Sequence, residues 1–258
     1  ALDNFCWTDP VETDRNPEGS YKLAQLVRAC MGLYDACVAY RVPLISGKDS
    51  MRNDYRGGGV AISIPPTLLV SVVGMVDEAT RAITMDAKAA GDLVYVIGTT
   101  YGDLGRSELA GLVGLNGGAV PRVRDLKATA DRYVALHDAI AESLVSSCHD
   151  CSDGGLGVAL AETAFAGDLG LTVNLEDVPR GGDLSDVELL FCEAPCRLVV
   201  TVPPACSSRF EAALGEGAAP IGHVVGDKRL KITGVSGERV VDESLEALKR
   251  AWRSPMSF

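Results

Sequence analysis

The sequence lacks a long apolar run. No segment approaches the roughly eighteen consecutive apolar residues of a membrane span, and no basic segment followed by an apolar stretch opens the chain, as an export signal would. Hydrophobic residues still make up 47% of the 258 residues, which is enough for the cores of one large or two smaller domains. We therefore expect a globular protein of the cytoplasm with no membrane partner.

Positive charge is also scarce. The 24 Lys and Arg residues stand against 35 Asp and Glu residues, which gives a formal net charge of -11. Binding to nucleic acid or to an anionic membrane needs a surplus of Lys and Arg, so the charge argues against both partners. A small anionic substrate needs only a local positive or metal-lined pocket and stays possible.

A disulfide framework and the common catalytic motifs are missing as well. The eight cysteines belong to a chain too long and too apolar to need disulfides, so we expect free thiols in a reducing compartment. Cys148, Cys151, Cys192 and Cys196 could together form a zinc site, but their irregular spacing argues against it. The chain contains no G-x-G-x-x-G, Walker lysine loop, H-E-x-x-H or G-x-S-x-G.

The stretch PLISGKDSM, residues 43–51, is the first informative one. Residues 42–45 are apolar and predict a short buried strand, which the serine and glycine that follow should end. The next side chains suit a ligand: Lys48 a phosphate, Asp49 a divalent cation, and Ser50 either one. The alternative is an ordinary strand-to-loop transition with solvated charges.

A second informative stretch, CHDCSDGGLG at residues 148–157, precedes an apolar segment, residues 158–166, that predicts a helix. A helix N-terminus after a glycine-rich turn is suited to phosphate, and Asp150 and Asp153 could carry Mg²⁺ to neutralise it. The alternative is a helix that Asp153 caps without a ligand. The two uses are compatible.

Adjacent short oxygen-bearing side chains occur in the first strand, which we expect over residues 1–7. Asp3 and Asn4 lie near its end, a usual place for a metal or ribose contact. The same pair is also common in plain turns.

Hydrophobic periodicity predicts a mixed α/β (α+β) fold in two domains. The first domain, residues 1–77, should contain a helix over 20–40 whose single apolar face packs on a sheet. Its other expected strands cover 60–64 and 68–76. The second domain, residues 78–258, should have strands at 93–98, 171–173, 197–202, 219–225 and 230–233 and helices at 125–145, 158–166, 184–192, 207–214 and 244–252.

Five motifs together resemble the synthetase component of phosphoribosylformylglycinamidine synthase, also called formylglycinamide ribonucleotide amidotransferase. They are LDNFCW (2–7), KLAQLVRA (22–29), PLISGKDSM (43–51), IPPTLL (64–69) and SDGGL (152–156). In that family two duplicated halves each have an A-type and a B-type domain. The resemblance covers essentially the whole chain and implies the second half: an aminoimidazole ribonucleotide synthetase-like fold with part of an A domain followed by a B domain.

The resemblance also implies an activity. The family converts formylglycinamide ribonucleotide, ATP and glutamine-derived ammonia to the amidine, with Mg²⁺ as the metal. The first half of the synthetase carries the catalytic histidine, so we expect no catalytic residue here and no turnover by this chain alone. The implied partners are that first half, a glutaminase domain or subunit, a small nucleotide substrate and, for the isolated chain, a second copy.

Residue by residue, the resemblance implies nucleotide or Mg²⁺ contacts for Asp3 and Asn4, an ATP contact for Gly47, and a substrate or phosphate contact for Ser50. The short bacterial form has a Mg²⁺-binding asparagine where this chain has Lys48. Because a lysine repels a cation, a direct phosphate contact is the better expectation there.

In the second domain, Asp150 and Ser152 correspond to metal and nucleotide positions of the longer form of the family, whose second half holds an auxiliary nucleotide. We expect Gly154 to join them and Asp153 to serve as a further metal ligand. Residues 193–195, EAP, occupy the place of a substrate-binding Glu-Ser-Gln motif. Their divergence implies that this copy does not bind the formylglycinamide group.

Two hypotheses follow from the resemblance. In the first, the chain is a nucleotide and Mg²⁺ platform in which the turns at Ser50 and Asp150 converge on one triphosphate. In the second, it is a degenerate scaffold that pairs with the first half and the glutaminase. A related ATP-dependent enzyme, such as aminoimidazole ribonucleotide synthetase, selenophosphate synthetase or thiamine-monophosphate kinase, is a further alternative that fits the motifs less well.

Overall fold

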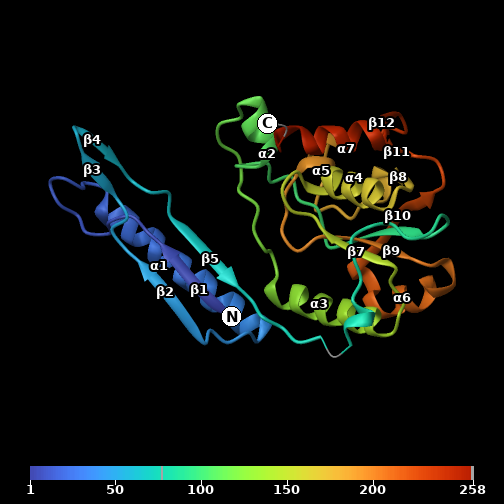
Figure 1. The fold of residues 1–258 in the computed structure, drawn as a ribbon, viewed down its shortest axis with the longest axis horizontal. Helices are drawn as coiled ribbons and strands as arrows, with labels where there is room; N and C mark the ends of the chain where they lie inside the picture. Colours follow the sequence, from blue (N-terminus) through green and yellow to red (C-terminus); the bar gives the residue numbers. More distant parts are fainter. Residues whose placement is uncertain (77, 257–258) are drawn as a thin grey trace. The chain divides into compact units, whose positions relative to one another are not determined.

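The computed structural model describes residues 1–76 and 78–256, and the chain divides into two compact units, Ala1–Asp77 and Glu78–Phe258. The first unit combines one helix with its own sheet, and the second unit combines several helices with another (Figure 1). The mixed α/β class expected from the sequence is therefore confirmed. Within the described part of the chain, no helix is both long enough and apolar enough to cross a membrane.

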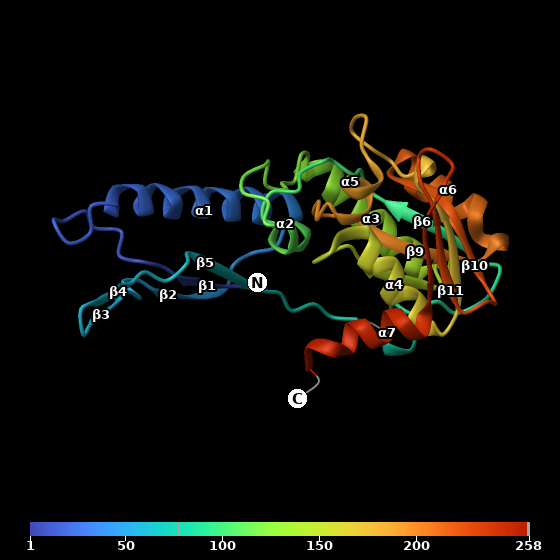
Figure 2. The same ribbon diagram turned by 90° about the horizontal axis from the view of Figure 1, so that it is seen from above.

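The first unit has one long helix beside a small sheet (Figure 2). Its elements are α1 (Gly19–Tyr40), β1 (Leu2–Cys6), β2 (Ser46–Ser50), β3 (Tyr55–Gly57), β4 (Val60–Ile62) and β5 (Thr67–Ser71). The sheet order is β2-β1-β5, with β1 parallel to β2 and antiparallel to β5. β3 and β4 form a separate hairpin, and Gly58 and Gly59 supply the positive φ angles that its turn requires.

Helix α1 has one broad apolar face, which the sheet covers only in part. Leu26 and Leu33 are partly buried, as a face on the sheet requires, whereas Leu23, Tyr34 and Val38 are 47%, 68% and 59% exposed. The apolar positions form the one continuous face that we expected, but the expectation that the sheet buries this face was only partly right. The sheet covers one edge of the face, and the other edge is an apolar stripe that stays uncovered within this unit.

The polar segment after α1 forms a strand, contrary to expectation. We expected residues 42–45 to be the strand, but they are irregular, and β2 begins only at Ser46. Strand β1 decides this register, because Leu2 at its start pairs with Ser46 in a parallel ladder. The ladder hydrogen bonds override the low strand propensity of glycine, aspartate and serine.

Asp54 joins three segments of the first unit. Its carboxylate accepts hydrogen bonds from the Thr8 hydroxyl at 2.9 Å, the Asp9 backbone N–H at 2.7 Å and the Ser63 hydroxyl at 2.5 Å. Burial acts to raise the pKa of Asp54, but these hydrogen bonds to the ionised form outweigh it and the pKa is lowered. The ionised carboxylate therefore holds the segment after β1 to the hairpin.

We expect Asp54→Ala to lower the free energy of unfolding of the first unit by about 1–2 kcal/mol, because the buried Thr8 hydroxyl and the partly buried Asp9 N–H lose their acceptor. The stabilisation is present above 3.8, the ordinary pKa of an aspartate, and is lost as the pH falls through the lower folded-state pKa. Urea unfolding followed by Trp7 fluorescence in a Trp252→Phe background measures it. The exposed Asp14→Ala serves as control, and equal midpoints for both variants at pH 7 would contradict the account.

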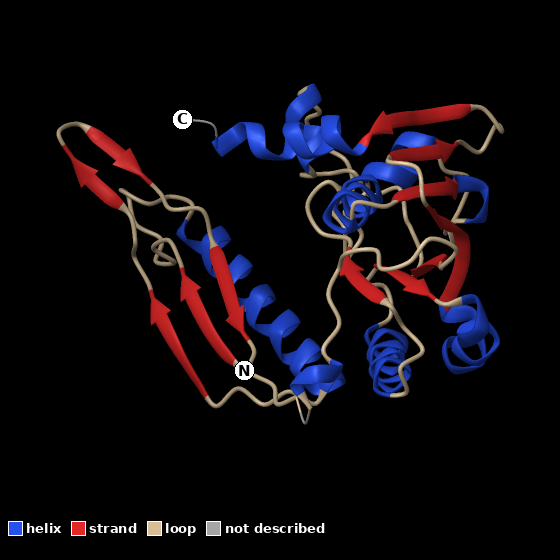
Figure 3. Cartoon of the chain, turned by 45° about the vertical axis from the view of Figure 1, so that its right-hand side comes forward, coloured by secondary structure: helices blue, strands red, loops and turns tan. Residues whose placement is uncertain are grey.

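The second unit contains a seven-stranded mixed sheet in the order β12-β11-β8-β10-β6-β9-β7. Figure 3 shows its strands in red and the surrounding helices in blue. Its strands are β6 (Leu93–Ile97), β7 (Ser147–Asp150), β8 (Gly170–Asn174), β9 (Leu198–Val202), β10 (Ala218–Val225), β11 (Arg229–Thr233) and β12 (Arg239–Ser244). Its α-helices are α2 (Glu108–Val113), α3 (Leu126–Ala141), α4 (Gly155–Gly167), α5 (Asp186–Phe191), α6 (Ser207–Leu214) and α7 (Leu245–Arg253). Only β8 and β11 pair in parallel in this sheet.

Alternating side chains of the central strands build two cores. In β6, Val94 and Val96 belong to the core under α4 and α5, whereas Tyr95 and Ile97 belong to the core under α3 and α6. All four are buried. Two-sided burial explains why this strand reads as a continuous apolar run.

Most expected elements of the second unit are present within a few residues. Sequence reasoning missed β7 and β12, since β7 is the polar segment SCHD and β12 carries four charged or hydroxyl side chains. The alternative cap at Asp153 is wrong, because α4 has Gly154 at its N-cap and no side-chain capping hydrogen bond.

Candidate functional site

Parallel pairing of β1 with β2 divides the predicted site residues of the first unit between two faces. Side chains alternate along a strand, and residues paired across a ladder share a face. One face carries Asp3, Phe5, Gly47 and Asp49, and the other carries Asn4, Cys6, Lys48 and Ser50. Asn4 and Asp49 therefore lie on opposite faces of this sheet and cannot ligate one metal ion together.

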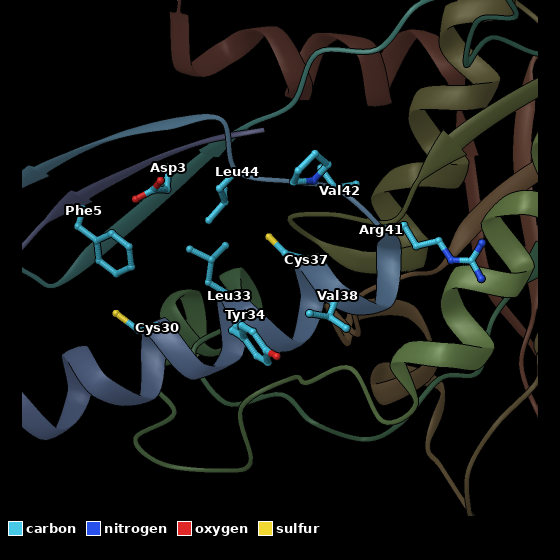
Figure 4. A pocket seen from close by; sticks show the side chains of 11 residues that line it. Asp3, Phe5, Cys30, Leu33, Tyr34, Cys37, Val38, Arg41, Val42 and Leu44 are labelled. Carbon is cyan, nitrogen blue, oxygen red and sulfur yellow. The ribbon is translucent and has the colours of Figure 1, made fainter.

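Gly47 makes room for Asp3. A Cβ at Gly47 would lie 2.2 Å from Asp3 Oδ1, so the carboxylate occupies the space over the glycine. Asp3 also lines a largely apolar groove of about 570 Å³ between β1 and α1, in which Figure 4 shows it with Phe5 and Leu33. The opposite face presents the exposed Lys48 beside the half-buried Ser50, which suits a phosphate better than a metal.

In the second unit the predicted residues gather at one turn. β7 ends at Asp150, and the turn closes with a hydrogen bond from the Gly155 N–H to the Ser152 carbonyl at 3.0 Å. Gly154 and Gly155 have φ angles of 77° and 66°, which favour glycine. The turn feeds directly into α4, as the glycine pattern predicted.

The Asp150 carboxylate of this turn is largely exposed and has two side-chain partners. Its side chain is 69% exposed, the Ser152 hydroxyl donates to Oδ2, and His149 Nδ1 lies 3.4 Å from Oδ1. The Ser152 hydrogen bond is the main cause that lowers the pKa of Asp150. The carboxylate is thus ionised at neutral pH and open to a cation.

His149 connects this turn to the last helix. Its Nε2 lies 2.8 Å from Glu162 Oε2, and the other oxygen of Glu162 accepts a hydrogen bond from Trp252 Nε1 at 2.8 Å. The His149 side chain is 13% exposed and that of Glu162 20%. Sequence reasoning missed Glu162 and Trp252, because nothing local links residues so distant in the chain.

The Glu193 carboxylate already accepts a hydrogen bond from the backbone N–H of Gly154, which we expected to be available for a phosphate. Its Oε1 accepts hydrogen bonds from the backbone N–H groups of Gly154 and Glu108, both at 2.9 Å. An anion that approached Gly154 would have to replace this carboxylate. Glu193, the first residue of the diverged EAP segment, therefore holds the turn before α4 and the start of α2 through its carboxylate.

Arg197 fixes the loop that carries Glu193. It is 1% exposed and donates to the Thr100 hydroxyl at 2.8 Å, to the Ala194 carbonyl at 3.4 Å and to the Cys192 carbonyl. Three acceptors around one buried guanidinium hold the loop in a single conformation.

No protein-only metal cage accompanies these residues. In the described ranges, no group of three or more His, Cys, Asp or Glu side chains is arranged to hold a metal ion. Within the described residues none of the eight cysteines takes part in a disulfide, and burial raises the pKa of Cys148 to about 12 and that of Cys151 to about 11.

Known proteins resemble this chain in sequence over most of its length. The family model "AIR synthase related protein, C-terminal domain" matches residues 89–235. The phosphoribosylformylglycinamidine synthase subunit PurL of Lactobacillus acidophilus is 34% identical, over 89% of this chain and 29% of that protein. PurL of Limosilactobacillus fermentum is 36% identical, over 92% of this chain and 30% of that protein. The chain thus spans less than a third of the length of these curated relatives.

Solved structures agree in fold. The Thermotoga maritima PurL complexed with ATP has a TM-score of 0.64 and 17% identity, over 96% of this chain and 37% of that one. The hydrogenase maturation protein HypE of E. coli has a TM-score of 0.59 and 20% identity, over 94% of this chain and 71% of that one. At such identities the likeness concerns the fold, whereas the family model covers more than half of the sequence. The chain belongs to the AIR synthase related family, and the resemblance to phosphoribosylformylglycinamidine synthase that its motifs indicated is confirmed.

Proposed function

We propose that this chain is the second half of a phosphoribosylformylglycinamidine synthase synthetase and holds a magnesium nucleotide at the turn after β7. The observation that carries the proposal is the Asp150 carboxylate, which is exposed, ionised and next to Ser152 at the entry to α4. The T. maritima PurL complexes with ATP and ADP support a nucleotide as the ligand.

The donor set fits Mg²⁺ bound together with a nucleotide. Mg²⁺ in nucleotide sites usually takes one or two protein carboxylates and fills its other positions with phosphate oxygens and water. Asp150 supplies one such carboxylate, and the exposed Asp153 stands in the same turn. When bound, the ion offsets phosphate charge, while Ser152 orients the Asp150 carboxylate through its hydroxyl.

For the first unit we propose that residues 1–77 form the C-terminal part of an A-type domain and residues 78–258 a B-type domain. Lys48 and Ser50 share one face of the β1–β2 pair, which supports a phosphate contact there. Asp3, beside Gly47 on the other face, would take part only through a separate contact, to ribose or to metal.

In this proposal the complete enzyme forms a carbon–nitrogen bond with ATP and converts formylglycinamide ribonucleotide to the amidine. The chain alone is inactive and pairs with the first half of the synthetase and with a glutaminase. The uncovered apolar stripe of α1, which includes Leu23, Tyr34 and Val38, supports a protein partner for the first unit. The isolated chain would cover the stripe by pairing with a second copy. The T. maritima PurLQS structure, which shares the fold, supports an assembly with other subunits.

A scaffold role is the second candidate, and the carboxylate of Glu193 at the Gly154 N–H favours it. Asp150→Asn and Ser152→Ala in the complete synthetase separate the two roles. A platform predicts loss of the nucleotide that copurifies and at least about tenfold lower activity, since charged contacts are removed. Wild-type nucleotide content and activity in both variants would overturn the platform and leave the scaffold.

A further inference from the structure

A polar cavity of the 78–258 unit has no part in the proposed nucleotide site. Its volume is about 220 Å³, and it opens between the start of α3 and the loop that precedes β9. Arg122, Arg124 and Arg132 line it together with residues 194–196, so we name it the arginine cavity. Three guanidinium groups make the lining of this cavity positively charged, although the net charge of the chain is -11.

Asp125, which lines the cavity, and Asp103, which pairs with Arg124, are already engaged. Asp103 pairs with Arg124 at 2.5 Å, and the Arg124 guanidinium lies 4.5 Å from the centre of the Tyr101 ring. Asp125 accepts a hydrogen bond from the Ala128 N–H at 2.9 Å and so caps α3. These contacts hold Arg124 in place without neutralising the other two arginines.

Arg122 and Arg132 keep unused donors. Within the described residues neither forms an ion pair, and the buried Nε of Arg132 has no hydrogen-bond partner. Arg132 is positioned by a hydrogen bond of 3.2 Å from Nη2 to the Thr129 hydroxyl, and Thr129 is buried. A fixed guanidinium with spare donors is suited to an oxyanion, which takes two parallel hydrogen bonds from the fork.

The size of the cavity limits the ligand. Pockets for complete drug-sized molecules measure roughly 300–1,000 Å³, so about 220 Å³ admits a single small group. A phosphate carries a charge of about -1.5 to -2 at neutral pH and three acceptor oxygens. A carboxylate has less negative charge and fewer acceptor oxygens, so it would match several guanidinium groups less well. We propose that the arginine cavity binds a phosphate group, free or at the end of a larger molecule, and that Arg122 and Arg132 provide the contacts.

Inorganic phosphate is the probe for this proposal. Thermal stabilisation of the 258-residue chain is measured from 0 to 50 mM sodium phosphate against sodium chloride at equal ionic strength, and apparent affinities follow from the dependence on concentration. We expect Arg122→Gln to weaken phosphate binding at least about tenfold, because a charged hydrogen-bond donor is lost. The fold should tolerate this change, since the Arg122 side chain is exposed and forms no ion pair with another described residue. Arg132→Lys keeps the charge without the fork and should weaken phosphate binding less.

Two control variants distinguish binding in the arginine cavity from a general effect of positive charge and from binding at the turn after β7. Arg250→Gln removes one positive charge from α7, where Arg250 pairs with Glu246, and should leave phosphate binding unchanged. Asp150→Asn should also leave it unchanged, so that failure of the nucleotide proposal and failure of this one are distinguishable. No stabilisation of the wild type by phosphate, an equal loss in Arg250→Gln, or wild-type affinity in Arg122→Gln would overturn the proposal.

Discussion

Gly155→Ala is expected to destabilise the 78–258 unit by at least about 3 kcal/mol, with loss of any ligand bound at the turn after β7. Gly155 has a φ of 66°, and an alanine there costs of order 1–3 kcal/mol in backbone strain alone. A Cβ would also lie 2.5 Å from the Cys192 carbonyl oxygen and 2.8 Å from that of Leu190. Both are backbone atoms, so relief requires a shift of α5 against α4.

The measurement is chemical denaturation followed by Trp252 fluorescence in a Trp7→Phe background. Gly111→Ala is the matched control, because a Cβ at this position of α2 meets no atom within 4 Å. It should be neutral or stabilising by up to about 1 kcal/mol through better helix propensity. A Gly155→Ala variant that unfolds at the wild-type midpoint would show that the turn is not constrained as described.

Sequence periodicity could predict the elements whose burial is strong and local. The apolar spacing of α1 and the continuous run of β6 placed both within a residue or two. The turn before α4 could be predicted for another reason, since two consecutive glycines before an apolar run have few uses besides a turn with positive φ angles.

Long-range contacts decided what the sequence could not show. β2 is a strand because β1 offers it a ladder, not because Ser-Gly-Lys-Asp-Ser favours extended backbone. Glu193 reaches the Gly154 N–H from 39 positions away, and Glu162, which lies within α4, contacts His149 of β7 at 13 positions away. The opposite orientation of Asn4 and Asp49 likewise depends on register, which a one-residue slip would reverse.

The second large effect concerns the nucleotide itself. Asp150→Asn should weaken binding of ADP with Mg²⁺ at least about tenfold, because the amide loses the charge that faces the cation and the hydrogen bond from Ser152 weakens. Asp183→Asn is the matched control, since Asp183 is an exposed aspartate elsewhere in the same unit. ADP without Mg²⁺ should bind more weakly to the wild type and equally to both variants.

The most direct test of the account is the melting temperature of the wild-type chain, Asp150→Asn and Asp183→Asn, each titrated with ADP and Mg²⁺ to millimolar concentration. The account predicts a rise that depends on concentration for the wild type and Asp183→Asn, and little or none for Asp150→Asn. An unchanged melting temperature of the wild type at millimolar ADP and Mg²⁺, or an equal rise in Asp150→Asn, would contradict it.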